Sequence, residues 1–443
     1  MAGRRPNRRA AVTSAPVTAE VERLSHEGRG VARVAGKIVF IEGALPGEQV
    51  VFRYTRRHGQ FDEGSVLEVL RASPDRIVPR CAHAERCGGC SLQHQAGAAQ
   101  IAHKQAVLLE LLEHQAGVTP ARVLAPVQGP QWGYRRRARL SVRYVHKKQE
   151  VLIGFREKAS HFVADIARCE TLVAAVGTRL RELRALVASL SCVQEIPQIE
   201  VAAGDDDIAL LLRHLVPLTA DDETRLREFA RATGLRVYSQ AGGIETLRRL
   251  DGPEAPLSYR VAGLELEYLP GDFVQVNAAI NETIVPLAMD LLAVGAGDRV
   301  LDLFCGLGNF TLPLATRAAH VVGVEGEPGL VARAADNARR LGLHNVDFAA
   351  ANLFTPEGIA AIPAGAYSKV LLDPPRTGAA EVLAARDFRG VERVCYVSCN
   401  PVTLARDTAA ITGRHGFRLE AAGVLDMFPH TTHVESIALF SRP

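Results

Sequence analysis

The sequence predicts a multidomain α/β protein with three folded parts: a small β-barrel, a central α+β domain and a C-terminal doubly wound α/β domain. At 443 residues the chain is too long for one ordinary core, so two to four domains are expected. Residues 17–70 consist of short strand-like runs separated by turn residues, which is typical of a small closed barrel. From Asn277 onwards, strand and helix patterns alternate, which indicates a mainly parallel sheet covered by helices. The expected boundaries are 1–15 for a basic flexible tail, 16–73 for the barrel, 74–270 for the central domain and 271–443 for the last domain.

Within the barrel region, breaks rich in Gly, Pro and Asp separate five apolar runs, which we interpret as strands. These runs are Val17–Leu24, Gly30–Ala35, Lys37–Ile41, Gln49–Tyr54 and Gly64–Val69. The turn Ser73-Pro74-Asp75 ends the barrel. The tail ahead of it is rich in arginine and lacks an apolar segment, so it is not a secretory signal. It is either a flexible tail or an arm that contacts nucleic acid.

The central domain opens with a cluster of cysteines. Cys81, Cys87 and Cys90 lie close together, and Cys169 is a more distant fourth candidate. Four thiolates can bind zinc or an iron–sulfur cluster, and this pattern alone favours neither. Enzymes that generate radicals usually bind their iron–sulfur cluster through three cysteines at shorter, fixed spacings. The five residues between Cys81 and Cys87, and the fourth cysteine, argue against that kind of site. Such clustering among eight cysteines indicates a reducing, cytoplasmic environment. The sequence contains no run of 18 apolar residues, so a membrane span is not expected.

The rest of the central domain combines helical and strand patterns. Residues from about 95 to 115 and from 170 to 190 have helical periodicity, and residues 132–165 alternate as strands do. The stretch from Tyr134 to Lys148 is rich in arginine and lysine with interleaved tyrosines. This pattern suits neutralisation of an RNA backbone and stacking on splayed bases, although a solvated charged face would look the same.

A cofactor site is predicted at the first strand of the C-terminal domain, where strands begin to alternate with helices. The apolar strand Val300–Leu303 runs into Phe304-Cys305-Gly306-Leu307-Gly308-Asn309, in which glycines allow a ligand to approach the backbone closely. A dinucleotide site would need a further glycine, but position 311 is Thr. Glu325 ends the next strand, where a carboxylate can bind ribose hydroxyls, and Asn352 could reach an adenine edge. Together with Asp302, this order favours S-adenosylmethionine over a nicotinamide cofactor.

Two later strand ends carry the residues expected to perform the chemistry. Asp373-Pro374-Pro375-Arg376 forms a stiff loop in which the arginine favours an oxo-bearing base or a phosphate. Cys399 follows an apolar strand and is flanked by polar residues, unlike Cys192, Cys305 and Cys395, which fit buried core positions.

A nucleophile and a later proton acceptor suit C5 methylation of uracil. The thiolate of Cys399 would add to C6, and Glu435 is the candidate base that removes the C5 proton. His430 and His433 have a spacing that could mimic a metal pair, but a third ligand is missing.

These motifs resemble the RNA uracil-C5-methyltransferase family from about residue 17 to the C-terminus. The first domain resembles a TRAM barrel, an OB-like RNA-binding fold, and the last domain resembles a Rossmann-like methyltransferase fold. The resemblance implies that the four cysteines of the central domain, Cys81, Cys87, Cys90 and Cys169, ligate a [4Fe–4S] cluster. It also implies S-adenosylmethionine contacts by Gln275, Phe304, Asn309, Glu325, Asn352 and Asp373, with Cys399 as nucleophile and Glu435 as base.

The combination of barrel and cysteine cluster is most similar to the bacterial members of this family that modify 23S ribosomal RNA at uridine 1939. The resemblance therefore implies an enzyme whose partner is 23S ribosomal RNA. We expect it to be cytoplasmic and monomeric, without a membrane or DNA partner. Two alternatives stay open: the same reaction on another 23S uridine or on tRNA, and a non-catalytic RNA-binding factor in ribosome assembly.

Overall fold

The computed structural model describes residues 15–442, which form two compact units. Unit 1 contains the described residues up to Ala84, with Cys90–His103 and His430–Thr432. Unit 2 contains Glu85–Gly89, Lys104–Pro429 and the residues from His433 onwards. The basic tail predicted for residues 1–15 lies outside the described residues except for its last position, and the predicted boundaries of the three domains stay a prediction.

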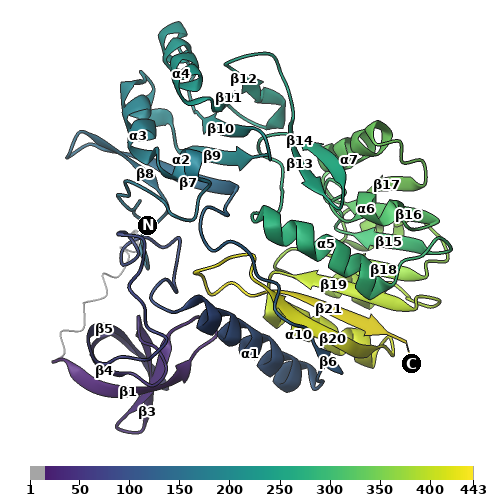
Figure 1. Cartoon of the computed structure of the whole chain (residues 1–443), viewed down its shortest axis with the longest axis horizontal. Coiled ribbons are helices and arrows are strands. Elements are labelled where there is room, and N and C mark those ends of the chain that lie inside the picture. The colour runs from purple at the N-terminus through teal and green to yellow at the C-terminus, as the bar shows by residue number, and fades with distance from the viewer. Residues whose placement is uncertain (1–14, 443) are drawn as a thin grey trace, which may run out of the picture. The chain divides into compact units, whose positions relative to one another are not determined.

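Unit 1 contains the predicted barrel (Figure 1). Its strands close in the order β1 (Val17–Leu24), β2 (Gly30–Val34), β3 (Lys37–Glu42), β5 (Phe61–Arg71) and β4 (Gln49–Arg57). The side chains of Val39, Ile41 and Phe52 are fully buried in its centre. The carboxylate of Glu48 is also buried; it accepts hydrogen bonds from the backbone of Leu45 and Ser73 and pairs with Arg76. These partners hold the pKa of Glu48 below its usual value against the effect of burial.

The first part of unit 2 is built on a six-stranded sheet. The order across the sheet is β12 (Arg248–Arg249), β11 (Arg236–Gln240), β10 (Ile208–Arg213), β9 (Gln198–Ala203), β7 (Arg137–Val145) and β8 (Glu150–Gly154). Its helices are α2 (Ala174–Gly177), α3 (Leu180–Ser189) and α4 (Ala220–Thr233), with 3-10 turns η1 (Val193–Glu195) and η2 (Ile244–Thr246). The hairpin of β13 (Leu257–Val261) and β14 (Leu264–Tyr268) follows.

The second part of unit 2 is an eight-stranded sheet. Its order is β17 (Val346–Ala350), β16 (His320–Glu325), β15 (Arg299–Leu303), β18 (Lys369–Leu372), β19 (Arg393–Ser398), β21 (Glu435–Ser441), β20 (Arg418–Leu425) and β6 (Arg122–Val123). The strands from β17 to β19 are mutually parallel, while β21 is antiparallel to both β19 and β20. The strand order reverses direction around β15, as in doubly wound folds, and ligands bind outside the carboxyl ends of such strands.

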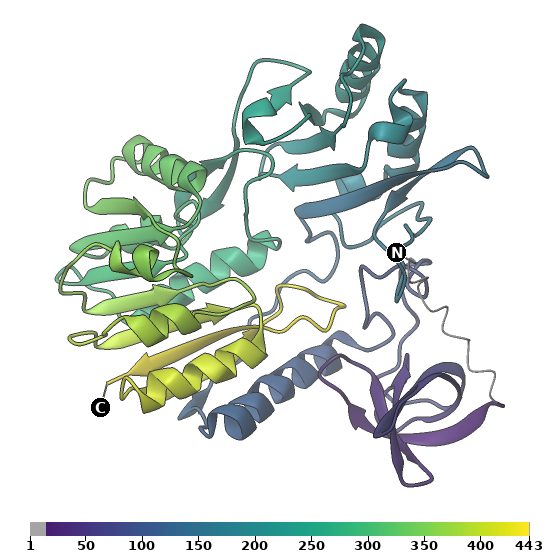
Figure 2. The same ribbon diagram turned by 180° about the vertical axis from the view of Figure 1, so that it is seen from behind.

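Helices cover both faces of this sheet. They are α5 (Ala278–Leu292), α6 (Thr311–Ala315), α7 (Pro328–Arg340), α8 (Pro356–Ala360), α9 (Ala380–Ala385) and α10 (Pro401–Gly413). Helix α5 lies in front of the sheet in Figure 1 and α10 lies in front of it in Figure 2, which is seen from behind. Asn400 starts α10 because its side chain accepts a hydrogen bond from Val402 N–H and Pro401 occupies the first turn. The three-layer fold predicted from the alternating pattern is therefore confirmed.

The structure adds two strands to the eight-stranded sheet that the sequence patterns did not predict. These are β20, next to the last strand, and the two-residue β6, which pairs with β20 in parallel. The helix predicted from about 95 to 115 is confirmed as α1 (Gly97–Ala116). Among residues 15–442, no helix combines the length and the apolar character needed to cross a membrane.

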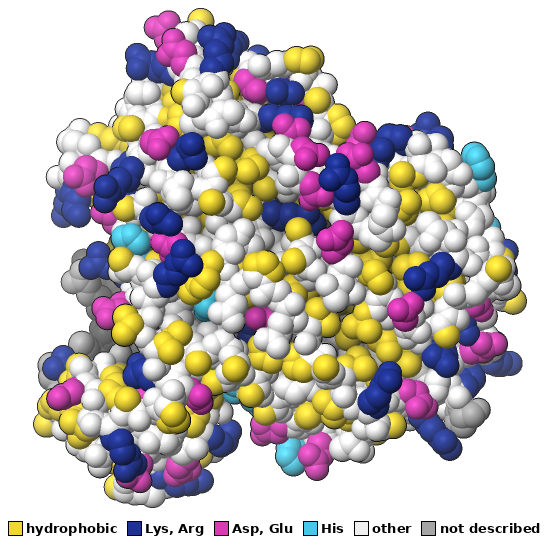
Figure 3. Space-filling view, in the orientation of Figure 1, with side chains coloured by type: hydrophobic (Ala, Val, Ile, Leu, Met, Phe, Trp, Pro, Cys, Tyr) yellow, Lys and Arg dark blue, Asp and Glu magenta, His cyan; other side chains and the backbone are white. Residues whose placement is uncertain are grey.

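The basic stretch of the central domain is only partly exposed. Arg136 is 3% exposed; its guanidinium donates to the backbone oxygen of Gln275 at 2.9 Å and lies 4.7 Å from the ring centre of Tyr259. Its neighbour Arg137 donates to the backbone oxygen of Asp272 at 3.0 Å. The prediction that Arg136 contacts RNA is therefore wrong, because its guanidinium is buried and binds groups inside the protein. Figure 3 shows cationic and anionic side chains interspersed over the barrel and around α4.

Candidate active site at the strand ends

The candidate residues of the C-terminal domain meet at one edge of the eight-stranded sheet. Phe304, Glu325, Asp373 and Cys399 lie at or directly after the carboxyl ends of β15, β16, β18 and β19. Parallel strands end at the same edge, so these residues come together although nearly 100 residues separate the first from the last. Glu435 joins them from the opposite chain direction, because it is the first residue of antiparallel β21.

The register of β19 and β21 brings the candidate nucleophile and base together. Ser398 pairs with Ser436, so the next position on each strand places Cys399 opposite Glu435. Cys399 is partly buried and Glu435 is 5% exposed. The charge of Glu435 is strong enough at Cys399 to raise the pKa of the thiol. The strand register therefore makes Cys399 and Glu435 neighbours, with Glu435 buried and Cys399 partly buried.

The loop after β15 has the backbone shape needed to hold a ligand. Phe304 has a φ of 66°, a left-handed conformation that non-glycine residues rarely adopt, and Gly306 and Gly308 also have positive φ values. The N–H of Gly306 donates to the carboxylate of Glu325 at 3.0 Å. The Phe304 ring lies 5.6 Å from the ring of Phe354. The strained backbone indicates a functional loop.

Asp302 lies beneath this loop and is fully buried. One of its carboxylate oxygens accepts a hydrogen bond from the Thr311 hydroxyl at 2.6 Å, and the other has no partner among the described residues. Burial, together with the charges of Asp373 and Glu325, raises the pKa of Asp302 to about 8. An unpaired buried oxygen is costly, so it indicates a site that is completed by a bound group.

Asn309 is held by other side chains. Its amide makes two reciprocal hydrogen bonds with the amide of Asn281, both at 2.9 Å, and its oxygen also accepts from the Tyr259 hydroxyl at 3.0 Å. Because Asn281 is 1% exposed, this pair ties the cofactor loop to α5 inside the core. The cofactor contact predicted for Asn309 stays a prediction, and any such contact has to share the side chain with this network.

We expect Asn309→Ala to lower the free energy of unfolding by about 1–3 kcal/mol, because it leaves the buried Asn281 amide without partners. Chemical denaturation with and without S-adenosylmethionine measures this. A variant that unfolds as the wild type does, yet binds the cofactor more weakly, would instead make Asn309 a direct ligand contact.

The remaining cofactor candidates lie around the same loop. Asn352 is exposed, and its side-chain oxygen accepts from the N–H of Phe354 at 3.0 Å. The side-chain amide of Gln275 lies 3.5 Å from the carboxylate of Asp373. Burial and the charge of Glu325 raise the pKa of Asp373 to about 7. Acids with raised pKa values are typical of functional sites, and Asp373 and Gln275 could present polar groups to one ligand.

The loop that carries Asp373 is supported from below by a buried carboxylate. Asp407 of α10 accepts hydrogen bonds from the N–H of Ala379 and the hydroxyl of Tyr396, at 2.8 and 2.6 Å. Gly378 packs so closely here that a β-carbon would lie 2.6 Å from the Asp407 carboxylate. The loop between β18 and α9 is therefore fixed against the helix that follows Cys399. None of these supporting residues was predicted, because each acts only through a contact distant in sequence.

Two basic side chains complete the surroundings of Cys399 and Glu435. Arg376 is exposed and donates to the imidazole of His433 at 3.1 Å. Burial and the neighbouring cations, Arg376 first among them, lower the pKa of His433 to about 4. His433 is therefore neutral and can accept this hydrogen bond, whereas a metal pair of His430 and His433 finds no support among the described residues.

Burial and carboxylate charges dominate the electrostatics of the pair. Burial and the charges of Glu435 and Asp373 raise the pKa of the Cys399 thiol to about 12, with Arg376 acting in the opposite direction. Burial and Asp373 raise the pKa of Glu435 to about 8, opposed by Arg376 and Lys104. In the ligand-free protein at neutral pH, both groups are therefore mostly protonated.

None of the cysteines in residues 15–442 forms a disulfide, and this includes Cys81, Cys87, Cys90 and Cys169. Cys81 and Cys90 belong to unit 1, whereas Cys87 and Cys169 belong to unit 2. The Sγ atom of Cys87 accepts from Gly89 N–H at 3.4 Å, and that of Cys169 lies 3.4 Å from the Thr171 hydroxyl. Hydrogen bonds of this kind suit thiolate ligands. Within the described part of the chain, however, no three histidine, cysteine or acidic side chains gather as a metal site.

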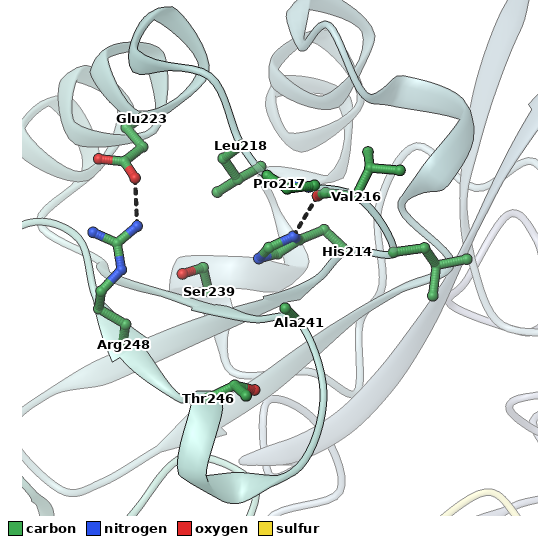
Figure 4. Close-up of a pocket in the computed structure, with 10 residues that line it drawn as sticks. His214, Val216, Pro217, Leu218, Glu223, Ser239, Ala241, Thr246 and Arg248 are labelled. Atoms are coloured by element: carbon green, nitrogen blue, oxygen red, sulfur yellow. Dashed lines mark hydrogen bonds and ion pairs between the residues drawn. The ribbon is translucent and has the colours of Figure 1, made fainter.

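A separate pocket of about 310 Å³ lies in the central part of unit 2 (Figure 4). Its lining includes Leu218, Ser239 and the ion pair of Glu223 with Arg248. The Nδ1–H group of His214 donates to the backbone oxygen of Val216 at 2.7 Å. None of the residues predicted for cofactor binding or catalysis lines this pocket, so it is distinct from the strand-end site.

Comparisons with known proteins agree with this geometry. Residues 98–443 match the family model described as tRNA (uracil-5-)-methyltransferase, and residues 16–67 match the TRAM domain. A methyltransferase with an RNA-binding barrel is thus the class that the fold and the strand-end site define. The chain belongs to the tRNA (uracil-5-)-methyltransferase family, which confirms the resemblance found in the sequence.

Relatives match nearly the whole chain. The 23S rRNA (uracil(1939)-C(5))-methyltransferases RlmD of Nitrosococcus oceani and Alkalilimnicola ehrlichii are each 52% identical over 438 residues, which is 98% of this chain and 98% of each relative. Among solved structures, the Pyrococcus abyssi tRNA (uracil-54, C5)-methyltransferase in complex with S-adenosyl-L-homocysteine matches with a TM-score of 0.74 and 20% identity. That match covers 96% of this chain and 100% of the other, and it shows that the fold is shared.

Proposed function

We propose that this protein transfers a methyl group from S-adenosylmethionine to C5 of uridine 1939 in 23S ribosomal RNA. The observation that carries the proposal is the placement of Cys399 opposite Glu435 at the strand ends, next to Asp373 and the loop after β15. The reaction needs this pair of side chains, and relatives about half identical over nearly the full chain are named for that nucleotide.

The residues present fit the cofactor. Glu325 ends β16, where a carboxylate suits ribose hydroxyls. Phe304 lies on the loop after β15 with a strained backbone, and its ring is close to the ring of Phe354. Asp373 and Gln275 would hold the polar end of the cofactor, and Asn352 and Asn309 would contribute at the remaining edges. When bound, S-adenosylmethionine supplies an electrophilic methyl group on a positively charged sulfur.

In the proposed reaction, Cys399 acts first. Its thiolate would add to C6 of uracil, and the electron pair of the C5–C6 double bond would move so that C5 becomes nucleophilic. C5 would then bond to the methyl group while the bond from that group to the cofactor sulfur breaks and its electron pair stays on the sulfur. Glu435 then removes the proton from C5 as a carboxylate. The C5–C6 double bond forms again as the bond between Sγ and C6 breaks, which returns the thiolate of Cys399.

The site electrostatics indicate when these steps become possible. The carboxylate charges near Cys399 raise the pKa of its thiol, and the positive charge of bound S-adenosylmethionine would oppose them. We therefore expect the pKa of Cys399 to fall, and more thiolate to form, when the cofactor is bound. Arg376 acts in the same direction, since its guanidinium favours the ionised forms of both Cys399 and Glu435.

Two further parts of the proposal concern RNA binding and the cysteine cluster. The TRAM barrel would bind the RNA, and a uridine would be unstacked and enter the strand-end site at a cost of a few kcal/mol.

Cys81, Cys87, Cys90 and Cys169 would ligate a [4Fe–4S] cluster. Because the methylation needs no electron transfer, the cluster would serve to order the central domain as a surface that binds RNA. The protein would act as a cytoplasmic monomer, without DNA or membrane partners.

Methyl transfer from labelled S-adenosylmethionine to separate 23S rRNA and tRNA transcripts, followed by mass-spectrometric mapping, tests the function. We expect 5-methyluridine at position 1939 only. Label at another 23S uridine or in tRNA would keep the chemistry and reject the target. Absence of label from both transcripts and from precursor ribosomal particles would favour a binding factor without catalysis.

Anaerobically purified protein is expected to contain about four iron and four sulfide ions per chain and to show the broad visible absorption of an iron–sulfur cluster. Cys87→Ser should remove most of this iron, whereas Cys192→Ser, a change at a buried cysteine outside the cluster, should leave it in place. One zinc ion per chain in place of iron would overturn the cluster assignment and keep the thiolate site.

A further inference from the structure

A buried lysine binds the segment that leads to Glu435, and the proposed reaction does not use it directly. Lys104 of α1 is fully buried, and its ammonium group donates to the carboxylate of Asp426 at 2.8 Å and to the backbone oxygen of Phe428 at 3.0 Å. Asp426 is itself 3% exposed. A buried charge needs such partners, and burial still lowers the pKa of Lys104.

The partners of Lys104 lie on the segment that leads towards Glu435. Asp426 directly follows β20, and its N–H donates to the backbone oxygen of Val127 at 2.8 Å. Three residues later, the backbone oxygen of Pro429 accepts from the hydroxyl of Tyr134 at 3.1 Å. Lys104 thus fixes the start of the connection between β20 and β21, and β21 begins with Glu435.

The charge of Lys104 also reaches Glu435. It favours the carboxylate form, in the same direction as Arg376 and against burial and the charge of Asp373. Cys399 faces Glu435 across the strand pair. His433 precedes it and is neutral, with Arg376 and Arg135 nearby. Of these groups, only Arg376 and Lys104 act to keep Glu435 ionised, and Arg376 is exposed whereas Lys104 is not.

We infer that Lys104 is a positioning residue for the proton-removal step: it holds the Asp426–Phe428 segment so that Glu435, farther along the same connection, faces Cys399. The inference rests on the proposed role of Glu435. It predicts that loss of Lys104 slows the last step of the reaction and leaves formation of the Cys399–RNA bond almost intact.

The test uses the full-length protein with two forms of one 23S fragment, carrying either uridine or 5-fluorouridine at the target position. Fluorine cannot leave as a proton, so the second RNA stops after Cys399 has added and reports only the earlier steps. The variant is Lys104→Met with Asp426→Asn, because removing the lysine alone would leave a buried carboxylate unpaired. Lys104→Gln, which keeps an N–H donor without the charge, is the second variant.

Lys369→Met is the matched control. Lys369 is 5% exposed and pairs with Glu392, but it lies on β18 at the end of the sheet opposite the strand-end site. It therefore tests the general effect of losing a buried lysine elsewhere in the same compact unit. We expect the control to retain turnover within about threefold of the wild type once both are folded.

For both Lys104 variants we expect turnover on uridine RNA to fall at least about tenfold at neutral pH, with the rate rising at higher pH than in the wild type, since one pKa unit is a factor of ten. The rate of adduct formation with 5-fluorouridine RNA should stay within about threefold. Equal losses in both assays, unchanged turnover, or variants that do not fold would overturn the inference. If Glu435→Gln itself turns over normally, the base assignment fails instead, and the two failures are distinguishable.

Discussion

Replacing Cys399 by alanine is expected to reduce methyl transfer to uridine RNA by on the order of 10⁴-fold or more. Without the thiolate, C6 receives no nucleophile and C5 does not become nucleophilic, so the methyl group has no acceptor. Initial rates with labelled S-adenosylmethionine measure the effect. Cofactor affinity should change little, because the side chain follows β19 while the glycine loop follows β15.

Cys395→Ala provides the matched control for this variant. Cys395 lies on the same strand, is fully buried and has its pKa raised strongly by burial, so it packs as an apolar side chain. We expect it to keep its activity and to lose roughly 1 kcal/mol of stability through a small cavity. Substantial methylation by Cys399→Ala, or an equal loss in both variants, would contradict the covalent mechanism.

Replacing Glu435 by glutamine is expected to slow turnover by about 10²–10⁴-fold and to accumulate a covalent complex between protein and RNA. The amide has nearly the same shape but cannot accept the C5 proton, so the methylated base stays attached to Cys399. Denaturing gels with labelled RNA measure the adduct. Glu420→Gln is the control, because Glu420 lies on neighbouring β20 and contacts the Ser441 hydroxyl at 2.8 Å.

The pH dependence gives a second measurement on the same residue. Burial and Asp373 raise the pKa of Glu435 to about 8, and only its carboxylate form can act as the base. If proton removal limits turnover, the wild-type rate should therefore rise with pH from about 6, reach half of its maximum near pH 8 and level off only above that pH. A rate that is flat over this range in the wild type, or an E435Q variant without accumulated adduct, would speak against Glu435 as the base.

Several parts of the fold follow from local sequence patterns. The parallel strands of the C-terminal domain are short apolar runs bounded by turns, and the barrel strands alternate with Gly and Pro breaks, so both were predictable. Strand β20 was missed, and β6 is only two residues long and exposed, so it has no periodicity of its own. Its existence depends on pairing with a strand about 300 residues later.

The site residues also divide into those that local sequence patterns identified and those that depend on distant contacts. Residue types at strand ends identified Glu325, Asp373, Cys399 and Glu435 as one set, because strand ends of a doubly wound sheet share an edge. The patterns could not indicate that Asn309 is tied to Asn281 or that Arg136 is buried. Both depend on partners far along the chain, whose approach is decided by packing.

The sequence by itself determined the class of the protein, the alternation of parallel strands and helices in the last domain, and the chemistry that its cysteine and carboxylates can perform. These depend on side-chain type and on local periodicity. Only the tertiary structure decided that antiparallel β21 sets Glu435 opposite Cys399 and that Lys104 lies beneath the segment leading to it. Strand direction, register and burial arise from contacts between distant segments, and they set the pKa values on which the reaction depends.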